Sequence, residues 1–198
     1  MDFNQIINRA RNIILSPVSE WEAIKAEAKP SKDVLMNYVI PLVLLVAICK
    51  ILGSLLFHMS YFSLSYSLLD ALIAIIVPIG SVYISALIIN ELAPSFGSQK
   101  NFEAAFRLLA YSMTASYIAS AAAGLLSIVG ISMILSLFGL YSIYLLYIGL
   151  GPMMGTPEDK KIVYIIVSII ITFVIMAIIS WFLTMILIGS HAGMSLMR

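Results

Sequence analysis

Long apolar stretches, separated by short polar segments, make up most of the chain after residue 33. Five of them are long enough to cross a bilayer, which needs about 20 mostly apolar residues because unpaired backbone groups cannot face hydrocarbon. We therefore predict an all-α polytopic membrane protein, a five-transmembrane-helix bundle formed by residues 31–198. Its spans are expected at about residues 34–57, 62–92, 102–125, 128–151 and 159–189.

Local residue types predict where these helices begin and bend. Ser31, Asn101 and Thr156 precede the first, third and fifth spans and are expected to act as N-caps, because short polar side chains accept hydrogen bonds from the first helical N–H groups. Pro41 predicts a kink near the start of the first span, and Pro78 predicts one near the middle of the second.

The segment before the first span, residues 1–30, has a different pattern. Apolar residues recur at helical spacing from Phe3 to Ile14, with polar residues between them, and a second short amphipathic helix with Trp21 follows Pro17. We interpret this segment as two amphipathic helices that lie in the cytoplasmic interface of the membrane. A helix dedicated to docking a partner is the alternative.

Composition and charge support the membrane assignment and narrow the function. The chain is 62% hydrophobic and 11% charged, whereas soluble domains average about 45–50% and 25%. A net charge of +1 provides no basic field for nucleic acid, so we expect no nucleic-acid partner. The single cysteine, Cys49, lies in an apolar run, which excludes a disulfide framework within the chain.

Most cations lie on one side of the predicted membrane. Nine of the eleven lie before the first span or at the entrance to the third or fifth: Arg9, Arg11, Lys25, Lys29, Lys32, Lys100, Arg107, Lys160 and Lys161. Because cytoplasmic loops are enriched in Lys and Arg, the N-terminus is predicted to be cytoplasmic and the C-terminus outside.

Two charges fall inside the predicted spans. Lys50 in the first span and Asp70 in the second would lie at similar depth if the two helices are antiparallel, so they can pair. An unpaired charge is costly in hydrocarbon, and we favour an ion pair that fixes the register of the two helices. The alternative is a proton or ion relay in which Asp70 exchanges a proton.

A second charged group is expected at the cytoplasmic side. Glu103 and Arg107 are four residues apart on one predicted helix, and Glu91 ends the preceding one. We interpret the three as an interfacial clamp. A specific anionic-lipid site at Arg107 is the alternative.

Metal and catalytic chemistry have little support in the sequence. Imidazole and thioether groups, which suit a soft metal, gather on the predicted outer side: His58, Met59, His191, Met194 and Met197. Because they form no repeated motif, we expect no cofactor. No metalloprotease, nucleophile-elbow or phosphate-loop motif occurs. We therefore predict that the protein is not an enzyme.

Three stretches carry a resemblance to a known family: SPVSEWEAI (16–24), NFEAAFRLLAYS (101–112) and LYSIYLLYIGLGPMMGTPEDKKIVY (140–164). They are similar to the Yip family, five-span proteins first known as interactors of Rab-type GTPases. The third stretch is the most specific, and the resemblance implies a role for its loop residues: Tyr141, Tyr144, Gly151, Pro152, Thr156, Pro157, Glu158 and Asp159.

The chain also departs from the eukaryotic pattern of that family. It lacks the long polar N-terminal region and the Asp-Leu-Tyr-Gly-Pro motif, and both departures weigh against a GTPase partner. A compact prokaryotic relative in the plasma (inner) membrane is the expected identity. The resemblance implies a non-enzymatic protein that binds or organises membrane components, with a membrane-protein partner or self-association. The alternative is a small transporter or lipid-handling protein that uses Lys50 and Asp70.

Overall fold

The computed structural model describes residues 3–57, 64–126, 134–135, 137–175 and 177–178, and every regular element in these ranges is helical. The main helices are α1 (Phe3–Leu15), α2 (Pro17–Glu27), α3 (Ser31–Val34), α4 (Ile40–Phe57), α5 (Leu64–Leu92), α6 (Phe102–Ser112), α7 (Thr114–Leu126) and α9 (Phe138–Met154). A further helix covers residues 161–175. The predicted all-α class is confirmed for the described residues.

Three helical stretches are long and apolar enough to cross a membrane: Ser31–Phe57, Ser67–Phe96 and Phe102–Leu126. They correspond to the first three predicted spans. The apolar helix α9 has 17 residues, and the predicted spans 128–151 and 159–189 both extend into residues outside the described ranges. The count of five spans therefore stays a prediction.

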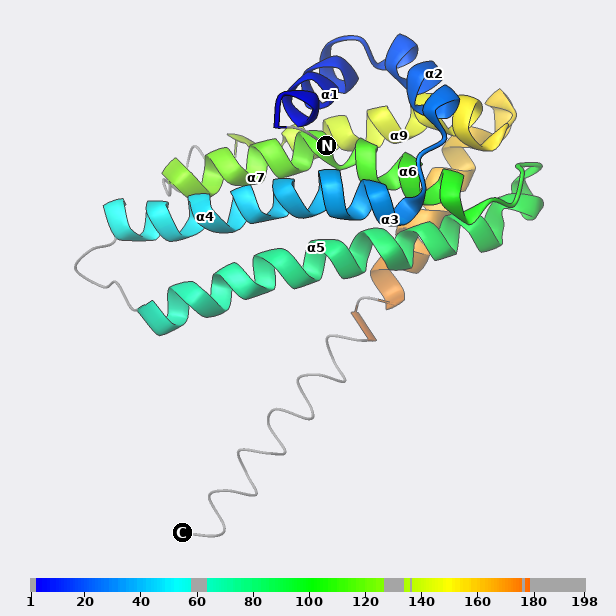
Figure 1. Ribbon diagram of the computed structural model, residues 1–198. Helices are drawn as coiled ribbons and strands as arrows, with labels where there is room; N and C mark the ends of the chain where they lie inside the picture. The colour runs from blue at the N-terminus through cyan, green and yellow to red at the C-terminus, as the bar shows by residue number, and fades with distance from the viewer. Residues whose placement is uncertain (1–2, 58–63, 127–133, 136, 176, 179–198) are drawn as a thin grey trace, which may run out of the picture.

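The long helices run side by side (Figure 1). α4 packs against both α5 and α7, while α9 packs against α6 and α7. The α4 and α5 ends that approach residues 58–63 lie at one end of the bundle, and the α5–α6 turn lies at the other, together with α2 and the end of α9 (Figure 1). We call this second end the turn end.

Proline and capping residues account for several local features. A π-helical turn at Leu35–Val39 ends two residues before Pro41. Proline has no N–H to donate, and its ring clashes with the preceding turn, so regular helical hydrogen bonding is interrupted there. Pro78 lies inside α5, which remains a single helix. The predicted N-cap at Asn101 is confirmed, because its side chain accepts a hydrogen bond from the Ala104 N–H at 3.1 Å.

The other two predicted N-caps are wrong. Pro30, not Ser31, precedes α3, and Ser31 is the first helical residue, with its N–H and hydroxyl both bonded to Glu103. Pro157 precedes the turn Glu158–Lys160, and the Thr156 hydroxyl lies 2.8 Å from Ser98 Oγ instead of capping it. In both cases the polar side chain that the local sequence predicts as a cap binds a residue from a distant segment instead.

The hydrophobic core lies around α6 and extends into the N-terminal helices. Residues from Ala104 to Ser112 of α6 are all buried. Ile6 and Ile13 of α1 and Trp21 and Ile24 of α2 belong to the same core as the bundle residues. Trp21, which the sequence predicted at the membrane interface, is fully buried. The N-terminal helices are thus packed against the bundle.

The contact between Trp21 and α9 depends on a glycine. A Cβ at Gly149 would lie 2.6 Å from Trp21 Cε2 and 2.6 Å from Leu108 Cδ1, closer than carbon atoms can approach. We expect Gly149→Ala to destabilise the protein by about 1–3 kcal/mol, because an added methyl group in a packed core forces its neighbours to move. Thermal unfolding in mild detergent measures this change.

The matched control is Gly139→Ala on the same helix. Its Cβ would have only Ser116 Oγ nearby, at 3.7 Å, which is an ordinary contact. This variant should keep or slightly raise the melting temperature, since alanine favours helix more than glycine. Equal melting temperatures for the two variants would mean that Trp21 does not pack tightly on α9.

Candidate functional site

A buried charged cluster joins α1, α2 and α6. Arg9 Nη1 donates a hydrogen bond to Glu20 Oε1 at 2.5 Å, and Arg9 Nη2 donates another to Glu27 Oε1. The guanidinium carbon lies 5.7 Å from the centre of the Tyr111 ring. Arg9 and Glu20 are each only 8% exposed. We call Arg9, Glu20, Glu27 and Tyr111 the Arg9 cluster.

Helical spacing explains how these groups meet. Arg9 lies on the buried stripe of α1 with Ile6, Ala10 and Ile13, at intervals of three and four residues. Glu20 and Glu27 are seven residues apart on α2, which places them two turns apart on one face. Arg9 therefore bridges two turns of α2 and fixes how the two helices cross.

Arg9 and Glu27 stay charged at neutral pH. Burial alone would lower the pKa of Arg9, but the hydrogen bond to Glu27 and the charges of Glu20 and Glu27 raise it above its usual value. Burial alone would raise the pKa of Glu27, but hydrogen bonds from Lys29 and Arg9 outweigh burial and lower it. Lys29 Nζ lies 2.9 Å from Glu27 Oε2. The pairing thus offsets the cost of desolvating the charges.

The predicted clamp residues are found in three separate contacts. The Glu103 carboxylate accepts hydrogen bonds from the Ser31 N–H and, at 2.9 Å, from the Ser31 hydroxyl, and so holds the start of α3. Arg107 is 8% exposed and donates to the Lys29 carbonyl at 2.7 Å. Glu91 pairs with Lys100 at 2.5 Å on the surface. The charge of Glu103 also acts on Arg107 one turn along α6, whereas Glu91 belongs to a separate surface pair.

Two turns pack together at the turn end. The Gln99 N–H donates to the Met154 carbonyl at 2.8 Å, and Ser98 Oγ lies 2.8 Å from Thr156 Oγ1. Gly97 and Gly155 both have positive φ values, 68° and 67°, which glycine adopts without strain. These contacts join the segment 97–101 to the segment 155–161, and we call the two segments the turn pair.

The loop residues implied by the family resemblance are spread along α9 and the turn pair. Tyr141 donates to the Ile14 carbonyl at 2.7 Å, and the Tyr144 ring lies 5.3 Å from the Tyr141 ring. Gly151 leaves room for Lys161, whose Nζ would be 2.9 Å from a Cβ there.

The rest of that set lies at and beyond the end of α9. Pro152 lies inside α9, and Pro157 starts the turn that follows. Glu158 pairs with Lys161 at 2.6 Å, while Asp159 is exposed. Of the eight loop residues implied by the resemblance, only Thr156 is buried. The exposed carboxyl groups are therefore available at the turn end.

The structure brings Lys50 and Asp70 together between α4 and α5. Lys50 Nζ lies 3.0 Å from both carboxylate oxygens of Asp70, and about a third or more of each side chain remains exposed. One turn away, Ser54 Oγ lies 3.2 Å from Ser67 Oγ. Lys50 also packs over Gly124 of α7, where a Cβ would be 2.8 Å from Lys50 Cγ. The pair therefore connects three helices.

A cavity that the sequence did not predict lies between α4, α5, α6 and α7, with serines in a mostly apolar lining, and we call it the serine cavity. Its volume is about 280 Å³, and four serine hydroxyl groups lie in its lining: Ser81, Ser85, Ser116 and Ser120. Tyr117 also lines it, is 6% exposed, and has a buried hydroxyl without a partner in the described part of the chain. The repeated four-residue spacing of the serines was the available signal.

The metal-binding hypothesis falls on residues outside the described ranges: His58, Met59, His191, Met194 and Met197. Within those ranges, no group of three or more His, Cys, Asp or Glu residues is arranged to hold a metal ion.

Comparison with known families supports the resemblance seen in the sequence. The model of the Yip1 domain matches residues 11–191, most of the chain. The chain belongs to the Yip1 family. Yip1 proteins are a non-enzymatic family of membrane proteins, and the long apolar helices described above are those of an integral membrane protein. Neither the curated proteins nor the solved structures contain a match to this chain.

Sequence reasoning missed the central residue of this Yip1 protein's charged cluster. Arg9 is one of the polar residues that lie between the apolar positions of the first helix, and its spacing from Ile6 and Ile13 places it on the apolar stripe. A charged residue on an apolar stripe, with Glu20 and Glu27 on the next helix, was a signal for a buried ion pair. The contact with Tyr111 could not be predicted, because it depends on how α2 docks on the bundle.

Removing the Arg9 charge should release the N-terminal helices. In Arg9→Met the carboxylate of Glu20 stays buried without a cation, and breaking such a pair costs about 3–5 kcal/mol. We expect faster proteolysis within residues 1–30 and a lower melting temperature. Lys25→Met, which removes an exposed cation on the outer face of α2, is the control and should behave as wild type. Equal proteolysis of the two variants would show that the Arg9 cluster does not hold α1 and α2.

Proposed function

We propose that this Yip1 protein is a non-enzymatic membrane scaffold that binds another membrane protein through its turn end. The contact surface consists of the exposed face of α2 and the turn pair. We place this surface in the cytoplasm, because nine of the eleven cations lie on the same side of the predicted spans.

The observation that carries the proposal is the rigid docking of α2. Its inner face, with Glu20, Trp21 and Ile24, is buried in the Arg9 cluster and the core. Its outer face, with Val18, Glu22 and Lys25, is exposed. A helix that only rested on lipid would have no need for a buried carboxylate such as that of Glu20. Its fixed position therefore supports a role in presenting a surface of defined shape.

The turn pair extends this surface with mixed charge. Glu158, Asp159 and Lys160 are exposed, and the Glu91–Lys100 pair lies at the same end. Mixed charges on a rigid patch suit a specific protein contact, because complementary charges select a partner and reject others. An apolar patch of equal size would suit lipid instead.

Site-specific photo-crosslinking in cells tests this proposal. A photoreactive amino acid at Val18 and another at Asp159 should give covalent adducts with the same membrane protein, since both positions belong to one surface. The control position is Ile76, an exposed apolar residue on α5 that we expect to face lipid. The proposal fails if neither Val18 nor Asp159 gives a protein adduct, or if the two positions capture unrelated proteins.

The serine cavity favours a second candidate function, transport of protons or a small polar solute. Lys50 and Asp70 lie in the same bundle as the cavity, and Tyr117 offers it an unused hydroxyl. Buried polar groups inside a membrane-spanning bundle often mark a solute or proton pathway. The contact of Lys50 with Gly124 supports a structural pair equally well.

Proteoliposomes that contain a pH-sensitive dye distinguish these two roles. If the pair relays protons, Lys50→Met with Asp70→Asn abolishes proton flux while the protein stays folded. The control double variant is Glu91→Gln with Lys100→Met, which removes an exposed ion pair at the turn end. Flux from the wild-type protein equal to that of empty liposomes would leave the pair with a structural role only.

A further inference from the structure

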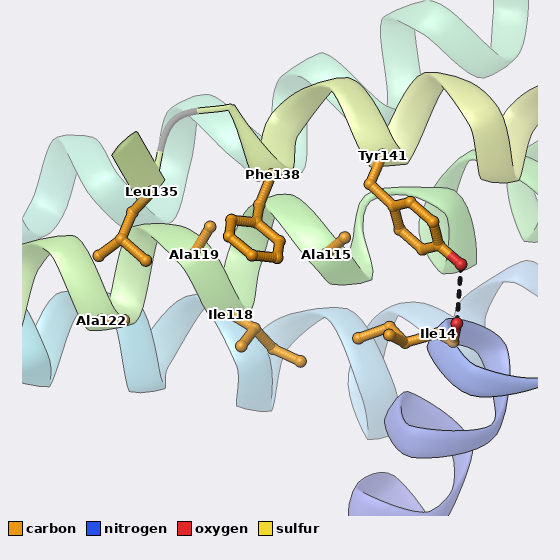
Figure 2. Close-up of a pocket in the computed structure, with 8 residues that line it drawn as sticks. All are labelled: Ile14, Ala115, Ile118, Ala119, Ala122, Leu135, Phe138 and Tyr141. Atoms are coloured by element: carbon orange, nitrogen blue, oxygen red, sulfur yellow. Dashed lines mark hydrogen bonds between the residues drawn. The ribbon is translucent and has the colours of Figure 1, made fainter. Parts of the chain in front are cut away.

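Two apolar grooves flank a ridge formed by Ile14 of α1 and Ile118 of α7. The first groove, of about 420 Å³, lies between α7 and α9. Figure 2 shows Ala115 and Ala119 on its α7 side, Phe138 and Tyr141 on its α9 side, and the Tyr141 hydroxyl bonded to the Ile14 carbonyl. That bond holds the end of α1 against the groove.

The second groove lies on the other side of the same ridge. It has a volume of about 450 Å³ and runs between α1 and the start of α4, with Phe3, Ile7, Leu42 and Leu45 in its walls. Ile14 and Ile118 line both grooves. The two grooves are thus neighbours, separated by two isoleucine side chains.

The grooves lie well inside the apolar length of the helices. Tyr141 is 13 positions from Met154 at the turn end, about 20 Å at helical rise, and Leu45 is 14 positions from Ser31, about 21 Å. We therefore expect hydrocarbon at the walls of the two grooves, and headgroups at the exposed side of α1, where Arg11 lies. Acyl chains fill an apolar groove there without leaving any polar group unpaired.

One cation lies at the second groove. Arg11 is the only charged residue in its lining, is exposed, and forms no ion pair within the described part of the chain. Its aliphatic stem can follow the groove while the guanidinium reaches toward headgroups. A guanidinium binds phosphate with two parallel hydrogen bonds, so its charge and shape complement a phospholipid.

We propose that the two grooves bind the two acyl chains of one anionic glycerophospholipid, with the ridge of Ile14 and Ile118 between the chains and Arg11 on the phosphate. The occupant is a bilayer lipid that sits under α1. This site is independent of the scaffold surface at the turn end, because neither Val18 nor Asp159 lines a groove.

Native mass spectrometry of the full chain, released from detergent with added phosphatidylglycerol or phosphatidylcholine, tests the site. The wild-type protein should retain one phosphatidylglycerol in preference to phosphatidylcholine. Arg11→Gln should reduce this preference about tenfold, which is the change in affinity that corresponds to losing one hydrogen bond to a charged group. Lys25→Gln, an exposed cation on the outer face of α2, is the matched control and should keep the preference.

Two variants test the grooves themselves. Ile118→Trp should block both chains and abolish binding, while Ala122→Phe fills only the first groove and should leave a single-chain lysophosphatidylglycerol bound as in wild type. Unchanged melting temperatures show that both variants fold. Because Arg11 is exposed, its substitution remains informative even if a groove variant unfolds.

Other results would overturn the proposal. Equal retention of both lipids by all variants would mean nonspecific lipid around the protein. Loss of a dimer, rather than of lipid, in Ile118→Trp would mean that a second copy covers the grooves. Crosslinking from Val18 and Asp159 should be the same in Arg11→Gln and wild type, so failure of the lipid site and failure of the scaffold can be told apart.

Discussion

The burial of Arg9 is the constraint on which the position of the two N-terminal helices, α1 and α2, depends. A guanidinium removed from water needs anions and hydrogen-bond acceptors close by, and α2 supplies two carboxylates within reach. The helices α1 and α2 must therefore pair with each other for either to fit on the bundle. Once paired, they bring Trp21 to Gly149, where the absence of a side chain allows close contact. The position of α2 beside the turn pair, and hence the proposed contact surface, follows from this pairing.

The sequence predicted features that depend on local patterns. Hydrophobicity along the chain predicts the long apolar helices, and the Asn101 side chain predicts its own cap. The helical rise predicts that Lys50 and Asp70 lie at a similar depth. The family resemblance was also confirmed, because its motifs extend over long contiguous stretches. Each of these features can be found without knowing which helices are neighbours.

The features that the sequence failed to predict depend on contacts between distant segments. Ser31 was assigned to a cap, yet Glu103, 72 residues later, takes both of its donors. Thr156 likewise binds Ser98 instead of the following turn. Glu91, Glu103 and Arg107 were grouped by their spacing along the chain, but each has a nearer partner from another element. In a bundle with few polar groups, each polar side chain binds the partner that packing brings close, and local spacing does not determine that partner.

The docking of α1 and α2 also has a consequence for how the protein is made. Their partners, α6 and α9, begin at Phe102 and Phe138, which are 75 and 111 residues after α2 ends at Glu27. Ribosomes synthesise the chain from its N-terminus, so the first two helices emerge long before the surfaces that bury Arg9 and Trp21 exist. During this interval their apolar stripes need another cover, and the membrane interface provides one. The amphipathic pattern of residues 1–30 thus suits two successive environments, first lipid and then protein.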